Sequence, residues 1–322
     1  MIELLIDNKN GDIWDISMIS SDIEWKTSRI GKASSCEFTV IGGLTKTNGF
    51  KCNPGDVVRL VKDGVGLFYG YVFSVDSGIE ENVKILAYDQ LRYLMTNETY
   101  VLNGMTATQI IQKIAGDLQL KVGVLANTKH SIPAMVEDNV KLMDIICKAL
   151  DRTLVATLQN YVFYDKFGSL TLQNITELAL DLVIGDDSLV YSYDFNRSID
   201  SDTFNRIKIV QDNKETGKRD VYIAQDSGNI ARWGRLQYFE KADEKMNAAQ
   251  INEKLIQMMT LKNRESKTLK LDSIGNIQVR AGVLVYVILE TLDIKQYFLV
   301  DECSHHFNGN DHYMSLNVKV IA

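Results

Sequence analysis

Residues 67–75 read LFYGYVFSV, and this stretch decides what kind of fold the chain can form. Successive side chains of a β-strand point to opposite faces. A strand with one face in water alternates apolar with polar residues. Here both faces are apolar, so we expect a second layer over the outer one. One face would carry Leu67, Tyr69, Tyr71, Phe73 and Val75, and the other Phe68, Gly70, Val72 and Ser74.

The composition is that of a soluble protein with packed cores. The chain has 322 residues, enough for two or three domains, with 45% hydrophobic and 24% charged residues. Its formal net charge of −7 lacks the overall basic character of nucleic-acid-binding proteins. We therefore expect no specific nucleic-acid binding by the chain as a whole, which leaves room for a local basic patch.

The N-terminus and the cysteines indicate synthesis in a reducing cytosol. MIELLIDNKNGDIWDI has no basic start followed by an apolar run, so it is not expected to be a signal peptide. The apolar run VLVYVIL at 283–289 is too short to span a bilayer, and no membrane insertion is expected. The four cysteines lie far apart, as free core thiols do.

Residues 1–97 are predicted to form a β-barrel. ELLID, the turn NKNG and DIWDI indicate a hairpin, and DVVRLV followed by KDG and LFYGYVFSV indicates a second. Short strands at regular spacing with tight turns are typical of a barrel or sandwich.

Residues 98–185 are predicted to form a two-helix α+β unit. Thr106 and Gln109 fit a capping box, and apolar residues recur behind it at helical spacing. A second helix is expected at about 139–150. YVFYDKFGSLTLQ at 161–173 reads as a hairpin that turns at Phe167-Gly168.

Residues 186–322 are predicted to form a second barrel with one long helix at about 243–263 and a hairpin across 204–226. Two segments hint at an internal repeat: PGDVVRL at 54–60 and AGVLVYV at 281–287 each precede an aromatic return strand. The expected fold is mainly β, with two small barrels flanking the helix-containing unit.

The sequence offers no motif for catalysis. On one strand, His305 and His306 would point to opposite faces, so they would not share a metal ion. No G-x-S-x-G elbow and no cysteine nucleophile motif occurs. We expect no metal, no cofactor and no enzyme activity.

The most basic region surrounds the predicted hairpin at 204–226. Acidic residues are interleaved with its cations, which favours a solvated hairpin or a partner surface over a phosphate-binding track. The cations are Lys208, Lys214, Lys218, Arg219, Arg232 and Arg235.

Several segments resemble one phage family. GLFYGYVFSVDSG and KILAYDQLRYLMTNETYV, within residues 66–101, are similar to the XkdQ/YqbQ proteins of the PBSX and skin prophages. That family belongs with the baseplate hubs of contractile tails, including the T4-like hub and the P2-like late control D protein. TATQIIQKIA, LMDIICKALDRT and YVFYDKFGSLTLQN continue the resemblance. Val283 stands where that family often has Asp.

The resemblance implies a structural hub subunit. Three copies, each with two barrels, would form a pseudo-sixfold ring that joins the hexameric tail tube to the trimeric spike. The implied partners are other copies of the chain, the tube protein and the spike protein, with a LysM-containing tail protein and the tape measure as further candidates. The implied location is the baseplate of a virion or of a tail-like particle such as a bacteriocin (tailocin), assembled in the host cytoplasm.

In such a ring, the second face of residues 67–75 would be covered by the helical unit or by another subunit. The candidate subunit-interface residues are Phe68, Tyr69, Tyr71 and Phe73. Two other classes remain open. One is a peptidoglycan-binding or peptidoglycan-degrading tail protein, because the two-helix unit is similar to LysM-type folds. The other is an unrelated enzyme on a β scaffold.

Overall fold

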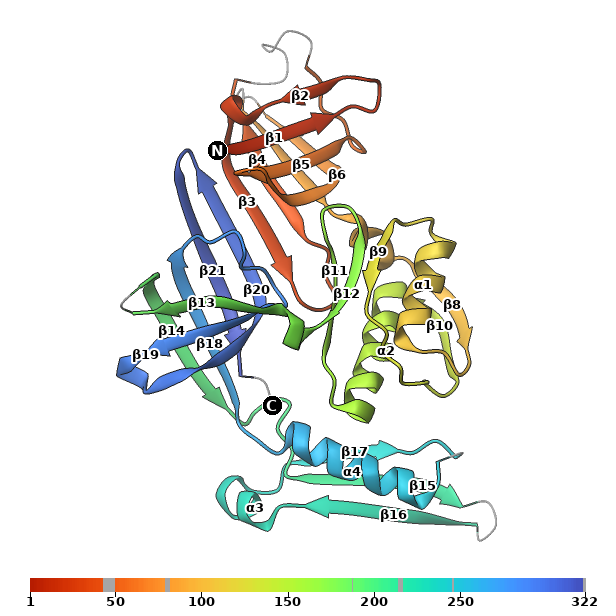
Figure 1. Cartoon of the computed structure of the whole chain (residues 1–322). Coiled ribbons are helices and arrows are strands. Elements are labelled where there is room, and N and C mark those ends of the chain that lie inside the picture. Colours follow the sequence, from red (N-terminus) through yellow and green to blue (C-terminus); the bar gives the residue numbers. More distant parts are fainter. Residues whose placement is uncertain (43–49, 79–81, 187, 214–216, 245, 321–322) are drawn as a thin grey trace.

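The computed structural model describes residues 1–42, 50–78, 82–186, 188–213, 217–244 and 246–320. Strands dominate it, and the helices gather in the middle of the chain and beside a small separate sheet (Figure 1). The mainly β class with an α+β unit is confirmed. No helix in these ranges is long and apolar enough to cross a membrane.

One sheet of 13 strands contains both ends of the chain. Its main path, in hydrogen-bonded order, is β14 (Val190–Ser198), β18 (Ser266–Ile274), β21 (Asp311–Lys319), β20 (Ile294–Asn308), β3 (Ser20–Ser28), β4 (Ser35–Val40), β7 (Val83–Tyr88), β6 (Val65–Ser77), β5 (Val57–Lys62), β1 (Ile2–Asp7) and β2 (Ile13–Asp15). Off this path, β19 (Leu284–Leu289) pairs with β20, and β13 (Ala179–Gly185) pairs with β19.

The sheet consists of two halves with equivalent strand order. The first runs β3-β4-β7-β6-β5-β1 and the second β14-β18-β21-β20-β19-β13. One difference is that β1 is antiparallel to β5, whereas β13 is parallel to β19.

The internal repeat suggested by the sequence is present in the backbone of the two halves. Gly55 and Gly282 share a φ of +95°, in the region that favours glycine. The Gly55 N–H donates to the Val72 carbonyl, and the Gly282 N–H to that of Val300, each at 2.8 Å. In both halves the register of the return strand then shifts by one residue, at Phe73 in β6 and at Asp301 in β20.

The prediction of two closed barrels is wrong. Among the described residues, no strand pairing closes either half into a ring. The reason lies in β20, which has 15 residues and serves both halves. Its first part pairs with β19 up to Leu299, and Glu302–Phe307 pair with β3 along the same edge. The two halves therefore merge into one sheet.

A histidine lies at this seam between the halves. Trp25 of β3 is opposite His305 of β20, and their rings stack with centroids 4.9 Å apart. His305 is fully buried, and burial lowers its pKa to about 3 and that of His312 to about 4. Both are therefore neutral at pH 7. His305 Nε2–H then donates to the Val279 carbonyl at 2.7 Å, and His312 Nε2–H donates to His305 Nδ1 at 2.9 Å.

His306 points the other way, as predicted. Its ring is half exposed, and Nε2 lies 3.4 Å from Glu24. Within the described ranges, no group of three or more His, Cys, Asp or Glu side chains is placed to hold a metal ion.

The middle of the chain contains two helices, a two-stranded sheet and a three-stranded sheet that includes a hairpin. The capping box of Thr106 and Gln109 is confirmed. The second helix starts three residues later than predicted, because the chain through Lys141 pairs with β8 as a strand. The elements are β8 (Asn97–Leu102), α1 (Ala107–Asp117), β9 (Val122–Leu125), β10 (Met135–Lys141), α2 (Leu142–Thr157), β11 (Tyr161–Asp165) and β12 (Leu170–Asn174).

A second three-stranded sheet has the order β16-β15-β17. The long helix predicted here begins at Ala248, capped by Asn247, and the short α3 was not predicted. The elements are β15 (Arg206–Asn213), β16 (Lys218–Gln225), α3 (Ser227–Trp233), β17 (Gln237–Lys241) and α4 (Ala248–Lys262). Short 3-10 helices complete the described chain: η1 (Ser17–Ile19), η2 (Gln90–Met95), η3 (Ile175–Leu178) and η4 (Glu290–Leu292).

The buried apolar residues form several distinct clusters. Each half of the main sheet has one, the middle helices share one, and α4 forms one with β15. The division into residues 1–97, 98–185 and 186–322 stays a prediction.

The buried His305 predicts a loss of stability in acid. Because its folded pKa lies below the ordinary 6.5, the unfolded chain binds a proton that the folded chain excludes, so stability falls as pH drops below 6.5 toward 3. From pH 7 to 5, the wild-type free energy of unfolding should fall by about 2 kcal/mol more than that of His305→Gln. Urea unfolding at both pH values measures this. His306→Gln, on the exposed face, is the control; an equal loss in wild type and His305→Gln would contradict the prediction.

Candidate functional site

The inner face of β6 belongs to the core of the first half-sheet. Phe68 and Val72 are each 2% exposed and lie in its apolar cluster. Gly70 lies between them, and a Cβ there would be 2.4 Å from the Tyr88 carbonyl oxygen. Only glycine lets β6 and β7 approach this closely.

The outer face of β6 has fewer residues than strict alternation predicts, because the pairing register of β6 shifts at both ends of this face. One shift lies between Gly66 and Phe68 and the other at Phe73. A β-bulge adds one residue and so changes which face the following side chains point to. Leu67 and Val75 consequently pack against the inner cluster. The outer face is left with Tyr69, Tyr71 and Phe73.

An aromatic ladder from the middle of the chain covers this outer face. The Tyr69 ring lies 5.8 Å from Phe167, which is in the β11–β12 turn. Tyr71 and Phe73 lie 5.7 and 5.9 Å from Tyr93 of η2. These distances suit edge-to-face and tilted aromatic pairs. Of the two covers expected from the sequence, the helical unit of residues 98–185 is present over Tyr69, through Phe167. The cover over Tyr71 is Tyr93, which lies within the predicted unit of residues 1–97.

Cations line the ladder. Arg59 lies over the Tyr69 ring at 5.7 Å, and Lys9 over Tyr71 at 5.0 Å. Arg92 lies 5.4 Å from the Phe73 ring centre. Each contact is within cation–π range, so the ladder binds the N-terminal hairpin and η2 electrostatically as well as by packing.

The candidate interface residues therefore differ in what they expose. Phe68 is buried in the chain's own core and has no surface to offer a second subunit. Tyr69 and Tyr71 are half-buried within the ladder. Phe73 remains 36% exposed, beside Tyr93 at 40%. An interface role for these residues stays a prediction.

A buried polar network lies beneath the ladder, where η2 begins. Asp89 accepts hydrogen bonds from the N–H groups of Ser34 at 3.0 Å and Leu91 at 2.9 Å. Gln90 Nε2 donates to Asp165 at 2.6 Å, joining η2 to β11. Burial raises the pKa of Asp89 to about 7, helped by the nearby Asp165 charge, and burial also raises the pKa of Asp165.

The second half-sheet contacts this network through one loop. The Arg280 guanidinium lies 3.5 Å from the centre of the Tyr164 ring of β11. Gly282 packs so closely on β11 that a Cβ there would lie 2.5 Å from Val162. The start of η2, the β11–β12 hairpin and the second half-sheet therefore meet at one rigid junction.

A cleft of about 530 Å³ opens beside the junction. It is lined by cations and hydroxyl groups, including Lys26, Lys32, Arg92 and Ser304. Its carboxylate, Glu302, is 3.0 Å from Lys32. Its lining contains no histidine, cysteine or aspartate.

Sequence reasoning missed the partners of the candidate residues. Arg92 lies 19 positions from Phe73, Tyr93 lies 22 from Tyr71 and Phe167 lies 98 from Tyr69, so no local pattern connects them. One signal was available in the sequence: the predicted turn places the bulky Phe167 before Gly168. In the structure Phe167 has a φ of +47°, which is rare for a bulky residue.

Comparison with known proteins identifies relatives along nearly the whole chain. A family model described as YQBQ-like matches residues 23–319. The phage-like element PBSX protein XkdQ of Bacillus subtilis (strain 168) is 30% identical over 99% of this chain and 97% of its own length. The protein YqbQ of the same strain is 29% identical over 99% and 96%.

A solved structure shares the fold. The 43 kDa tail protein of prophage MuSo2 from Shewanella oneidensis matches with a TM-score of 0.72 and 14% identity, over 98% of both chains.

The contact of Tyr69 with Phe167 should be measurable as a coupling energy. In a double-mutant cycle with Tyr69→Leu and Phe167→Leu, we expect about 1 kcal/mol of coupling, as for other edge-to-face pairs. Guanidinium unfolding of the four proteins measures it. Phe167→Leu combined with Tyr191→Leu, in the other half of the sheet, is the uncoupled control; equal coupling in both cycles would contradict the contact.

Asp89 should make the protein less stable as pH rises. Its folded pKa of about 7 lies above the ordinary 3.8, so the folded chain holds a proton that the unfolded chain loses between those values. Relative to Asp89→Asn, the wild type should lose on the order of 2 kcal/mol from pH 5 to 7.5. Urea unfolding measures the difference, with the exposed Asp12→Asn as control. A gain in relative stability over this range would contradict the assignment.

Proposed function

Because this chain belongs to the YQBQ-like family, we propose that it is a structural subunit of a contractile phage tail or of a phage-tail-like particle. The name of XkdQ assigns that relative to a phage-like element, and the solved MuSo2 protein is a tail protein. Within the particle, we propose that the chain is the baseplate hub, a homotrimer between tail tube and spike.

One observation supports the ring. Each half of the sheet contains both strands needed for a pairing like that of β20 with β3, which we call the seam. Within the described chain this pairing forms only once. Within the chain, Glu302–Phe307 of β20 pair with β3. By strand order, the equivalent of β20 in the first half is β6, and the equivalent of β3 in the second half is β14. An equivalent seam would join β6 of one subunit to β14 of the next.

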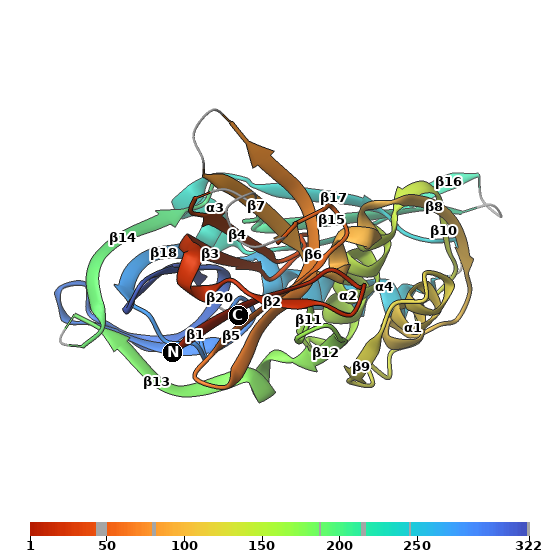
Figure 2. The same cartoon turned by 90° about the horizontal axis from the view of Figure 1, so that it is seen from above.

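The edge of β6 that this seam needs is open. The partner strand β5 begins at Val57, opposite Tyr71, so the segment Ser74–Ser77 pairs only with β7 on its other edge. In Figure 2 the far ends of β6 and β7 project beyond the body of the molecule. Unpaired backbone donors and acceptors on such an edge favour pairing with another chain.

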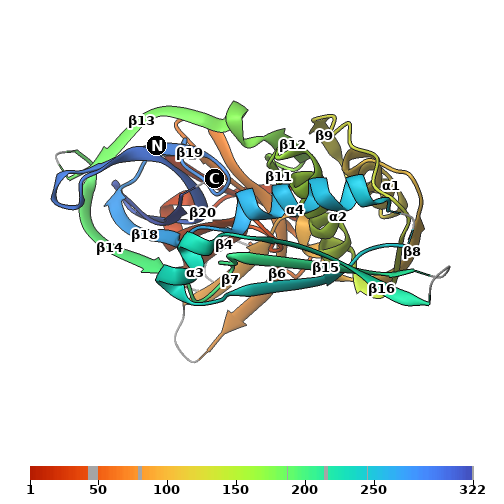
Figure 3. The same cartoon turned by 90° about the horizontal axis from the view of Figure 1, so that it is seen from below.

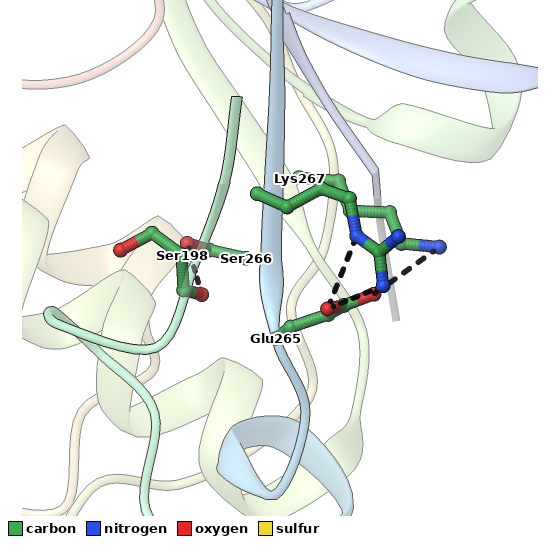
Figure 4. Close-up of polar contacts among 5 residues, drawn as sticks. Ser198, Glu265, Ser266 and Lys267 are labelled. Atoms are coloured by element: carbon green, nitrogen blue, oxygen red, sulfur yellow. Dashed lines mark hydrogen bonds and ion pairs between the residues drawn. The ribbon is translucent and has the colours of Figure 1, made fainter. Parts of the chain in front are cut away.

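The edge of β14 is open as well. Within the described residues, β14 pairs with β18 alone. Its end is held firmly: Ser266 Oγ donates to the Ser198 carbonyl at 3.1 Å, and Glu265 accepts from Arg197 at 2.8 Å, with Lys267 close by (Figure 4). A fixed, unpaired strand is a suitable docking edge.

The repeat also predicts the register of this seam. When the paired residues are followed from strand to strand, Trp25 leads to Val72 in the first half, and Phe195 leads to Val300 in the second half by the same number of steps. Trp25 is therefore equivalent to Phe195, and Val72 to Val300. Since His305 is opposite Trp25, Ser77 of one subunit would be opposite Phe195 of the next. Asp76 would then face Asn196, and the exposed Phe73 would lie at the interface.

Such contacts are head-to-tail, and head-to-tail contacts form a closed ring when the rotation between neighbours allows it. Each subunit supplies two equivalent half-sheets, so three subunits supply six positions around the ring. This number matches a hexameric tube on one side and a trimeric spike on the other, which are the partners we propose. We propose the baseplate as its location.

The in-register cysteine pair tests the ring. Purified chain carrying Asp76→Cys and Asn196→Cys, alone and with the spike protein, should form a disulfide-linked species at three times 36.4 kDa after mild oxidation. Opposite residues of paired strands have the Cα separation that a disulfide needs. Non-reducing electrophoresis and light scattering measure the product.

The control pair is Asp76→Cys with Ser192→Cys, four residues out of register on the same strand. Equal cross-linking by both pairs, or a strict monomer in every sample, would refute the proposed seam.

We propose no catalytic role. The alternative is peptidoglycan binding or degradation. A zymogram and a peptidoglycan pull-down test it directly.

A further inference from the structure

The small sheet β16-β15-β17 has one covered face. Helix α4 lies across it, with Ile251 and Leu255 in a shared cluster with Ile207 and Ile209 of β15. On its other side α4 reaches α2, where Gln257 donates to the Ala156 carbonyl at 3.0 Å. The second face of the sheet therefore points away from the rest of the chain, as the views from the front and from below show (Figures 1 and 3).

This second face, the open face, carries an apolar row. Strand register places Ile223 of β16 and Phe239 of β17 on either side of Lys208. In the next row, Val221 lies beside Val210. Val221, Ile223 and Phe239 are 51%, 43% and 54% exposed. A contiguous patch of exposed apolar side chains marks a surface for interaction with another molecule.

The open face is also basic, unlike the chain as a whole. Its positions on the three strands alternate with those that face α4, and they include four cations and one carboxylate: Arg206, Lys208, Arg219, Lys241 and Asp212. The Asp212 carboxylate accepts both Arg219 and Lys241. Lys214, part of the basic region noted in the sequence, lies outside the described residues.

Two of these cations have no carboxylate partner among the described residues. Arg206 Nε donates to the Gln237 side chain at 3.0 Å, and NH1 donates to that of Gln225, so two neutral amides hold its guanidinium in place. Lys208 Nζ lies 5.8 Å from the Phe239 ring centre. A pre-positioned guanidinium can donate hydrogen bonds to a carboxylate without much loss of side-chain entropy.

We propose that the open face binds an acidic amphipathic helix of another protein of the particle. The covered face shows the geometry: α4 sets an apolar stripe on the sheet, and its Lys254 forms an ion pair with Glu240 of β17 at 2.5 Å. A partner helix on the open face would place apolar residues on Ile223 and Phe239 and carboxylates at Arg206 and Lys208. Helix-on-sheet layers bury apolar faces in this way.

Charge complementarity favours this occupant over the alternatives. Two copies of the chain meeting by this face would bring like charges together. Nucleic-acid strands bind aromatic platforms, whereas two of the three exposed apolar residues here, Val221 and Ile223, are aliphatic. The inference rests on the proposed function in one respect: it needs another protein of the particle as the partner.

A peptide-binding assay on the full chain tests the proposal. The probe is a fluorescent helical peptide as long as α4, 15 residues, with a leucine stripe and glutamates elsewhere. Its counterpart has lysines in place of the glutamates. Fluorescence anisotropy at low salt should show binding of the glutamate peptide only, and hydrogen exchange should show protection in β15–β17.

Two double variants and one control make the test specific. Ile223→Asp with Phe239→Asp should weaken binding at least about tenfold, as loss of central contacts does. Arg206→Glu with Lys208→Glu should abolish binding of the glutamate peptide and create binding of the lysine peptide. Ile256 of α4 is 67% exposed, and Ile256→Asp should change the binding of neither peptide. All five substituted side chains lie at least partly in solvent, so the variants should fold.

Several outcomes would overturn the proposal. One is no binding of the glutamate peptide, or binding that both double variants retain. Another is a DNA duplex that competes for the face and binds it more tightly. A third is an oligomer of the wild type that Ile223→Asp with Phe239→Asp converts to monomer, since a second copy would then be the occupant. None of these results bears on the β6–β14 seam, which is tested separately by cross-linking.

Discussion

The structure depends above all on the backbone pairing of β20 with β3. It joins residues 280 positions apart, Trp25 with His305, and it makes one sheet of what would otherwise be two. The pairing is possible because β20 is long enough to serve β19 and then β3 along one edge. A buried, neutral histidine completes the hydrogen bonding behind it. Unpaired strand edges favour pairing with other chains. Among the described residues, the edges of β6 and β14 lack the partner that β20 and β3 find in each other, and we propose that these two edges pair between subunits.

The outer face of the aromatic strand β6 also helps to hold the two halves together. Tyr69 and Tyr71 fix the β11–β12 hairpin and η2 onto the first half-sheet, while Arg280 brings the second half against β11. These contacts set the angle between the two halves. A ring built from repeated half-sheets closes only if that angle is constant, so a rigid junction is what the proposed role would require. Cation–π contacts, buried polar contacts and a small apolar cluster that joins β11 to β19 and β20 hold this junction together.

Much of the fold was predictable from local signals. The capping boxes, the turn at Phe167-Gly168 and the strand runs depend on neighbours within a few residues, and they placed two long helices and most hairpins. Other features were not predictable, because they depend on distant partners. The start of α2 moved because Met135–Lys141 pairs with β8. Leu67 and Val75 turned to the inner cluster because bulges on both sides of Tyr69–Tyr71 reset the alternation. From the sequence, the open face of the β16-β15-β17 sheet could be recognised only as a basic region. Its apolar row depends on strand pairing and could not be recognised.

By itself, the sequence determined the mainly β class, the helices of the middle unit, the repeat of two glycine-led hairpins and the opposed directions of His305 and His306. Each of these follows from the period of a strand or helix and from short turns, which neighbouring residues decide. Only the tertiary structure decided that the two halves share one sheet, which residues cover the aromatic face, and which strand edges stay open. Those features arise from pairings between segments far apart in the chain, and backbone hydrogen bonds carry no sequence signal that could reveal them.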